Sequence, residues 1–103
     1  MIKINFQKND DQINEVIISG HSMFADYGKD IVCAAVSSIV TTTINGILII
    51  NDQAIYYENK ETFKIINQSF DEITNKLLDN LHNLLIDLQK DYPKNIEIGE
   101  EVK

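Results

Sequence analysis

The chain has 103 residues, enough for one domain spanning 1–103, and 44% of them are hydrophobic, so a folded core is expected rather than disorder. Its net charge is −7 and all nine cationic residues are lysines, which disfavours direct binding to a nucleic-acid backbone. The single cysteine excludes an intrachain disulfide and a multi-cysteine zinc site, and it favours a reducing compartment.

Two strands are predicted at the amino end of the chain. Residues 1–8 alternate apolar and polar side chains with a period of two, which is typical of a strand with one buried face. A polar cluster at 8–12 predicts a turn, and residues 13–19 predict a second strand paired with the first. Gly20 ends that strand, and residues 20–29 show no periodicity, so they are predicted to form a loop.

Residues 31–50 form a stretch of twenty residues without a charged side chain, which is long enough to span a membrane. Seven of them are serine, threonine, asparagine or glycine, and a membrane helix would have to satisfy these polar groups within hydrocarbon. The stretch is therefore predicted to be a buried helix in a domain that does not enter a membrane. Asp30 is predicted to be its N-cap, and Asn51 and Asp52 to end it.

A hairpin and a second helix are predicted next. Two β-rich runs, 54–59 and 62–67, are joined by a polar turn. Apolar side chains then recur every three or four residues, which predicts an amphipathic helix that begins with a capping box of Ser69 and Glu72 and ends before Pro93. Its predicted apolar face consists of Phe70, Ile73, Leu77, Leu81, Leu84 and Leu88.

Renewed alternation over residues 95–102 predicts a last strand. The element order is then ββαββαβ. The simplest architecture for it is an α+β two-layer sandwich with a mainly antiparallel sheet and both helices on one face. A chain of this size buries a modest share of its surface, so a homo-oligomer is expected.

Cys33 and His21 are the side chains best suited to chemistry. If Asp30 caps the helix, Cys33 is its third residue, where the helix dipole and the first N–H groups favour a thiolate. His21 follows the end of the second strand, within reach of a helix start packed against that sheet. A Cys-His pair could then catalyse acyl transfer, with N–H groups around 32–34 as an oxyanion hole. The alternative is a packed thiol and a turn histidine bonded to local backbone.

Other polar groups carry weaker signals. His82 is a rival partner for Cys33, but it lies at the rim of the second helix's apolar face. One cysteine and two scattered histidines fall short of a metal site, so no metal or other cofactor is predicted. Tyr56 and Tyr57 alternate on a strand, so at most one faces the core and the other is available to a subunit interface. An acidic group near the carboxyl end is interpreted as a solvated edge, with attraction of a basic partner as the alternative: Glu97, Glu100 and Glu101.

A specific pattern runs from residue 20 to residue 37. It consists of a Gly-His pair at 20–21, a short loop containing Gly28, and the run Asp-Ile-Val-Cys-Ala-Ala-Val-Ser at 30–37. This pattern resembles the ribosomal-processing cysteine protease family, usually called Prp, and the order of strands and helices fits that family along nearly the whole chain. Ser22 stands where an alanine is expected in many relatives, a departure that leaves the Cys-His pair intact.

The resemblance implies a small cytoplasmic homodimer that removes a short amino-terminal extension from a large-subunit ribosomal protein. It implies that Cys33 is the nucleophile and that His21 is the general base and acid. Two roles stay open for Asp30, helix N-cap and orienter of His21. The loop is expected to act as a flap over the peptide, and the predicted substrate contacts are Gly20, Ser22, Phe24, Tyr27, Gly28 and Ala34.

Two other functions are alternatives to a protease. A non-catalytic acidic dimer could hold a basic ribosomal protein, with Cys33 packed in the core. A thiol redox sensor is disfavoured, because no second cysteine in the chain can resolve a sulfenic acid. The reactivity of Cys33 separates the protease from the binding module.

Overall fold

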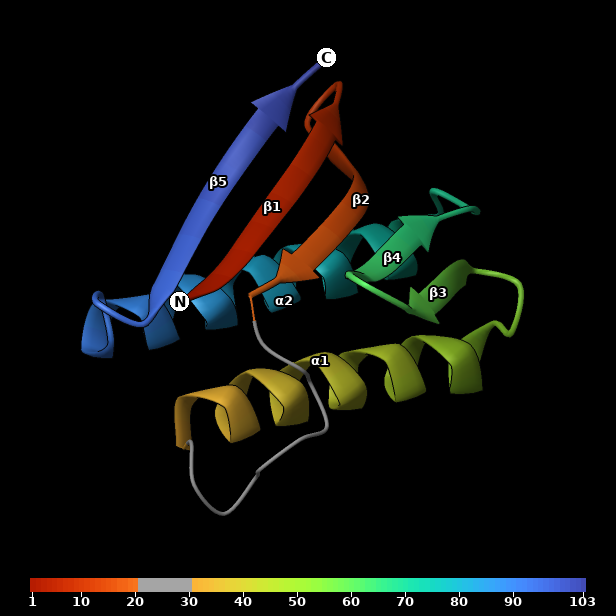
Figure 1. The fold of residues 1–103 in the computed structure, drawn as a ribbon. Helices are drawn as coiled ribbons and strands as arrows, with labels where there is room; N and C mark the ends of the chain where they lie inside the picture. The colour runs from red at the N-terminus through yellow and green to blue at the C-terminus, as the bar shows by residue number, and fades with distance from the viewer. Residues whose placement is uncertain (21–30) are drawn as a thin grey trace.

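A computed structural model describes residues 1–20 and 31–103 of the chain. The strands are β1 (Ile2–Asn9), β2 (Gln12–Ser19), β3 (Ile55–Asn59), β4 (Phe63–Asn67) and β5 (Ile96–Val102), and the helices are α1 (Ile31–Ile50) and α2 (Glu72–Asp91) (Figure 1). The predicted order ββαββαβ is confirmed, and each boundary falls within two residues of the predicted one.

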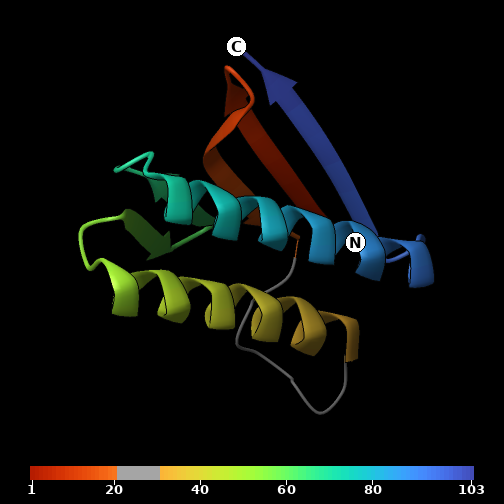
Figure 2. The ribbon, with the colours of Figure 1, turned by 180° about the vertical axis from the view of Figure 1, so that it is seen from behind.

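The five strands form one sheet in the order β3-β4-β2-β1-β5. Neighbouring strands pair antiparallel except β1 and β5, which pair parallel. Figure 2 shows both helices in front of the sheet, running in opposite directions, so that α1 begins beside the end of α2. The predicted α+β sandwich with both helices on one face is therefore confirmed.

The core lies between the sheet and the helices. Alternation along β1 turns Ile2, Ile4 and Phe6 toward the helices, and the same face of β2 contributes Val16 and Ile18. The helices close this layer with buried side chains that recur at helical spacing: Val36, Val40, Ile44 and Ile47 from α1, and Leu78, Leu81 and Leu85 from α2.

The start of α2 differs from the predicted capping box. The N-cap is Asp71, whose side chain accepts a hydrogen bond from the N–H of Thr74 at 2.8 Å. Ser69 instead donates its hydroxyl to the Asp71 carboxylate at 2.7 Å. The buried amide of Asn67 accounts for the shift, because its oxygen accepts the N–H of Phe70 at 3.0 Å and holds the chain in a turn before the helix begins.

The buried face of α2 is also rotated from the predicted one. Thr74, Leu78, Leu81 and Leu85 are buried, whereas three of the predicted positions, Phe70, Ile73 and Leu84, are 39%, 51% and 41% exposed. The apolar surface of α2 covers two adjacent faces of the helix, because one face packs on the sheet and the other faces α1. Spacing alone does not say which side faces the core.

Among the described residues, α1 is the one helix long and apolar enough to cross a membrane by length and composition. The core helix of a soluble protein meets the same criteria, and seven residues of α1 are buried inside the domain. The expectation that the chain does not enter a membrane stays a prediction.

Candidate active site

Cys33 lies in the first turn of α1, as its third residue, and only 3% of its surface is exposed. Its neighbours Val32 and Val36 are buried beside it, so the first turn is anchored in the core. The amino end of a helix carries a partial positive charge, which favours a negatively charged group there. The predicted placement of Cys33 at a helix start is confirmed: the helix end favours a thiolate, whereas burial beside the two valines opposes it.

Gly20 follows the end of β2 with a φ of 98°, in the left-handed region that favours glycine. A Cβ atom at this position would collide with the carbonyl oxygen of Met1. The chain therefore leaves the sheet in close contact with Met1, and only glycine permits that approach. This close packing explains why residue 20 is a glycine. The predicted contact of Gly20 with the substrate stays a prediction.

The structure places Gly20, Cys33 and Ala34 at the two ends of the connection between β2 and α1 (Figure 1). The other predicted site residues lie outside the described residues: His21, Ser22, Phe24, Tyr27, Gly28 and Asp30. The loop predicted at 20–29 and the predicted N-cap of α1 belong to the same segment. The pairing of Cys33 with His21 therefore stays a prediction.

His82, the rival partner of Cys33, is engaged elsewhere. Its Nε2 lies 2.7 Å from a carboxylate oxygen of Glu100, a close contact that is not aligned as a hydrogen bond. Its ring packs edge-on against Phe6, with centroids 4.8 Å apart. The side chain is 18% exposed, so the predicted rim position is confirmed. His82 thus connects α2 to β1 and β5.

The acidic residues near the carboxyl end lie on β5, an edge strand of the sheet, and they are exposed as predicted. Glu100 is more than a solvated charge, because it contacts His82 and also lies 3.4 Å from the ammonium group of Lys8. Sequence reasoning missed this three-residue cluster, since no local pattern connects positions so far apart in the chain.

The two tyrosines of β3 are both about half exposed, at 47% for Tyr56 and 48% for Tyr57. Tyr57 stacks on Phe63 of the neighbouring strand, with ring centroids 6.2 Å apart. Neither ring is buried in the core, which agrees with the prediction that at most one is. Among residues 1–20 and 31–103, no group of three or more histidine, cysteine or acidic side chains could hold a metal ion.

Comparison with known proteins gives matches in both sequence and structure. The family model described as "Cysteine protease Prp" matches residues 1–97. The ribosomal processing cysteine protease Prp of Mycoplasma genitalium is 50% identical over 40 residues, which are 39% of this chain and 35% of that protein. The protein of the same name from Staphylococcus aureus is 37% identical over 49 residues, 47% of this chain and 46% of that protein. These alignments span less than half the length of the curated relatives.

Solved structures share the fold over nearly the whole chain. The S. aureus ribosomal processing protease Prp, crystallised with a covalently linked product peptide, matches with a TM-score of 0.86 and 24% identity, covering 98% of this chain and 100% of that one. A protein of Streptococcus mutans matches with a TM-score of 0.84 and 23% identity, covering 100% of this chain and 96% of that one. At this level of identity the likeness establishes the fold.

Proposed function

The chain belongs to the cysteine protease Prp family, and from this membership we propose that it is a cysteine endopeptidase. Its proposed substrate is a large-subunit ribosomal protein, from which it removes a short amino-terminal extension in the cytoplasm as a homodimer. The observation that carries the proposal is the position of the chain's one cysteine in the first turn of a helix. The name "ribosomal processing cysteine protease", carried by the relatives, supports the substrate class.

The proposed reaction is acyl transfer through a thioester. The thiolate of Cys33 attacks the scissile carbonyl carbon, and N–H groups around residues 32–34 stabilise the oxyanion that forms. His21 holds the proton released by the thiol and gives it to the leaving amine. The shortened ribosomal protein leaves as this amine, and water then attacks the thioester with His21 as general base, which releases the amino-terminal extension with a new carboxylate and restores the thiol.

Access to the thiol is part of the proposal. Because Cys33 is only 3% exposed, a peptide carbonyl reaches it only if the groups that cover the thiol move aside. The flap role assigned to the β2–α1 connection, with apolar contacts from Phe24 and Tyr27 and a hinge at Gly28, rests on the sequence. Such gating would keep the thiolate away from unrelated proteins.

The test incubates the protein with an amino-terminally extended ribosomal protein and determines the product masses. Wild type is expected to give two fragments whose masses add up to the substrate plus one water. Cys33→Ala is expected to give no product, and His21→Ala to lose roughly 100-fold or more in kcat. The matched control is His82→Gln, because the chain has two histidines and His82 is occupied by Glu100 and Phe6.

Three outcomes decide the assignment. Cleavage by Cys33→Ala, or intact substrate with wild type, contradicts the proposed protease. Tight binding of the ribosomal protein without cleavage supports the acidic binding module instead.

Asp30→Ala separates the two roles of that residue: reduced stability with normal turnover indicates a helix cap, whereas a stable protein with almost no turnover indicates an orienter of His21.

A further inference from the structure

Strand β5 forms one edge of the sheet, and β1 is its one neighbour there. Its far end projects beyond the two helices, together with the β1–β2 hairpin (Figures 1 and 2). Edge strands are commonly protected by a lysine, a proline or a bulge, because their backbone groups can pair with another chain. The seven residues of β5 include no lysine or proline, and their register with β1 is continuous. This edge is therefore open to an added strand.

The hydrogen bonds to β1 show which backbone groups of β5 are available. The N–H of Lys103 donates to the carbonyl of Lys8 in β1 at 3.0 Å. Because successive residues of a strand direct their backbone groups to opposite sides, the odd-numbered residues of β5 face β1 and the even-numbered residues face outward. Ile96 bonds to the end of α2. The other outward N–H and C=O groups have no partner in the part of the chain that the structure describes, and they belong to Ile98, Glu100 and Val102.

A hollow on the outer face of the sheet adjoins this edge. Its volume is about 360 Å³, and it is lined by Asn5 of β1, Ile17 of β2 and Gly99 of β5, among others. The strand register places these three residues in one row across the sheet. A Cβ atom at Gly99 would meet the amide nitrogen of Asn5 at 3.5 Å, an ordinary contact, so packing among the described residues does not require this glycine. Glycine inside a strand often marks a place where another chain approaches closely.

The polar groups around the hollow favour a cationic hydrogen-bond donor. The side-chain oxygen of Asn5 is enclosed and has no hydrogen-bond partner among the described residues, and a buried acceptor without a donor is destabilising. Glu97 and Glu101 lie on either side of Gly99 on the same face of β5, and neither forms an ion pair within residues 1–20 and 31–103. Lys3 is the one cation that lines the hollow, so the local charge is negative.

We propose that an extended segment of the substrate protein adds to β5 as a new edge strand and places a lysine or arginine side chain over Gly99. This inference rests on the proposed function and adds a docking site for a basic ribosomal protein outside the first turn of α1. Backbone hydrogen bonds supply the affinity of an added strand, and side chains that enter pockets supply its specificity. The apolar stem of the basic side chain would lie across Gly99, and its cationic end would donate to Asn5 and a flanking glutamate.

Charge selects this occupant over a second copy of the chain. Two β5 strands paired with each other would bring their glutamates close together, and like charges on neighbouring strands are destabilising. A segment of a basic protein brings the opposite charge to the same edge. The glutamates of β5 therefore disfavour self-pairing and favour a lysine- or arginine-bearing strand.

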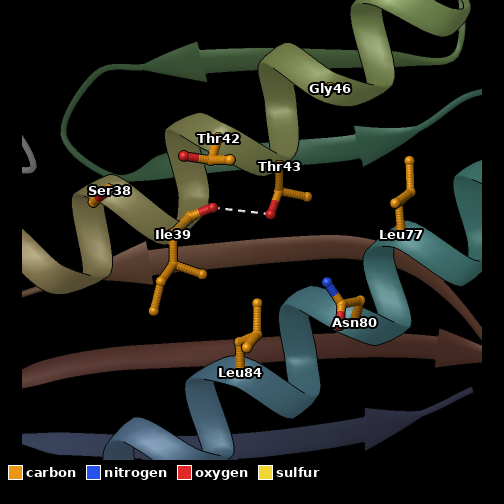
Figure 3. A pocket seen from close by; sticks show the side chains of 8 residues that line it. All are labelled: Ser38, Ile39, Thr42, Thr43, Gly46, Leu77, Asn80 and Leu84. Atoms are coloured by element: carbon orange, nitrogen blue, oxygen red, sulfur yellow. Dashed lines mark hydrogen bonds between the residues drawn. The ribbon is translucent and has the colours of Figure 1, made fainter.

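The groove between α1 and α2 is less suited to a basic segment (Figure 3). Every residue that lines this groove is uncharged. The hydroxyl of Thr43 in the groove donates to the carbonyl of Ile39 at 2.9 Å, so it is already paired within α1. The groove offers neither a strand edge nor a charge that selects a cation, whereas β5 offers both.

The first test measures the binding of a short fluorescent peptide of alternating lysine and threonine by fluorescence anisotropy. Saturable binding is expected, and the matched peptide of alternating glutamate and threonine is expected not to bind. Two further copies of the basic peptide carry backbone N-methyl groups, either on the lysines or on the threonines. Because only alternate N–H groups of an added strand face β5, one copy is expected to lose binding and the other to keep it. General attraction between opposite charges would affect both copies equally.

Gly99→Thr separates folding from docking, because the two are expected to change in opposite directions. Threonine favours an extended strand more than glycine does, so the unfolding midpoint in urea is expected to rise. Its side chain also fills the hollow, so the dissociation constant of the basic peptide is expected to rise about tenfold. A glycine with no part in docking would leave the dissociation constant unchanged on substitution.

A double variant, Glu97→Gln with Glu101→Gln, removes the two flanking charges and keeps the size of the side chains. The dissociation constant of the basic peptide is expected to rise about fivefold. The matched control is Asp52→Asn with Glu61→Gln, which removes the same charge from exposed positions before and after β3, the opposite edge strand. This control is expected to bind the peptide as wild type does. Equal effects of the two double variants would overturn the site.

Cleavage of the extended ribosomal protein connects the docking site to the proposed function. Gly99→Thr is expected to raise KM for the whole ribosomal protein and to leave kcat unchanged, whereas KM for a short peptide that spans only the cleavage segment is expected to stay constant. An unchanged KM for the whole protein overturns the substrate as the occupant of the edge. Peptide binding without any cleavage contradicts the protease and leaves the docking site standing.

The remaining outcomes decide the site itself. The docking site is overturned if the basic peptide shows no saturable binding, or if the two N-methylated copies bind equally. It is also overturned if Gly99→Thr changes the sedimentation of the protein and leaves peptide binding unchanged, because that result assigns the edge to a second copy of the chain.

Discussion

Cys33 is subject to two opposing influences. Burial disfavours a thiolate, whereas a helix amino end favours it, and the imidazolium of His21 would favour it further if the proposed pair forms. A cysteine that only fills the core experiences the first influence without a compensating partner. The balance between the two therefore distinguishes a nucleophile from a packed side chain, and it can be measured without knowing the substrate.

The pH profile of alkylation by iodoacetamide measures this balance. If Cys33 is the nucleophile, the rate in the folded protein is expected to have a midpoint below the ordinary value of about 8.5 for a thiol. The unfolded protein in urea provides the reference midpoint, and His21→Ala is expected to move the folded midpoint back toward it. A folded midpoint at or above that of the unfolded chain contradicts the thiolate.

At the scale of elements, periodicity predicted β1, β5 and α2 because each has one buried face, while an uncharged apolar stretch predicted α1 and β-rich runs predicted β3 and β4. It could not predict partners: alternation in residues 95–102 indicates a strand, but not that β5 pairs parallel with β1. It also misplaced the start of α2. Ser69 with Glu72 and Asp71 with Thr74 both have capping spacing. The choice is made by Asn67, whose amide oxygen accepts the N–H of Phe70 while its amide nitrogen donates to the carbonyl of Ile13, a strand residue that local sequence does not connect to it.

The cap of α2 carries a prediction about stability and pH. The pKa of Asp71 lies below its ordinary value of 3.8, mainly because its carboxylate accepts a hydrogen bond from the Thr74 N–H and, second, because it accepts one from the Ser69 hydroxyl. Folding therefore favours the carboxylate, so its contribution is fully present above that value and is lost as the pH falls through the lower pKa of the folded state. Asp71→Ala is expected to lower the urea midpoint at neutral pH, and the difference from wild type is expected to narrow near pH 3.

Asp71→Asn is the control for this measurement, because asparagine keeps a side-chain oxygen that can accept the Thr74 N–H. It should lose less stability than Asp71→Ala at neutral pH. If wild type and Asp71→Ala have equal midpoints there, the helix does not depend on this cap.

The candidate site was predictable to the extent that it is local. The position of Cys33 in a first turn follows from an uncharged apolar run that begins at residue 31, and this position is confirmed. The Glu100 contacts of His82 and Lys8 come from three different elements, so only the folded chain reveals them. Likewise the sequence predicted a buried helix at 31–50, but only one side of α1 is buried. Which side stays exposed depends on how α1 packs on the sheet and α2, and the sequence pattern does not specify that packing.

At the scale of the whole molecule, the net charge of −7 predicts how the chain would capture its proposed substrate, if that substrate is a basic ribosomal protein. Acidic surfaces attract such a protein before contact and raise the association rate more than the affinity of the bound state. Raising the ionic strength from about 0.01 M to about 0.1 M shortens the Debye length from about 30 Å to about 10 Å, which screens this attraction. We expect kcat/KM for the basic ribosomal protein to fall over this range, with kcat at saturation nearly constant.

A short neutral peptide with the same cleavage segment is the control, because it shares the chemistry and lacks the charge. Its kcat/KM is expected to be almost independent of salt, so the ratio of the two values isolates the long-range attraction from any effect of salt on the thiol. The dimer is the possible confounder: two acidic copies associate at least as well when their repulsion is screened, so salt cannot lower activity by dissociating them. A fall of the same size for both substrates would contradict electrostatic capture and place the salt effect in the site itself.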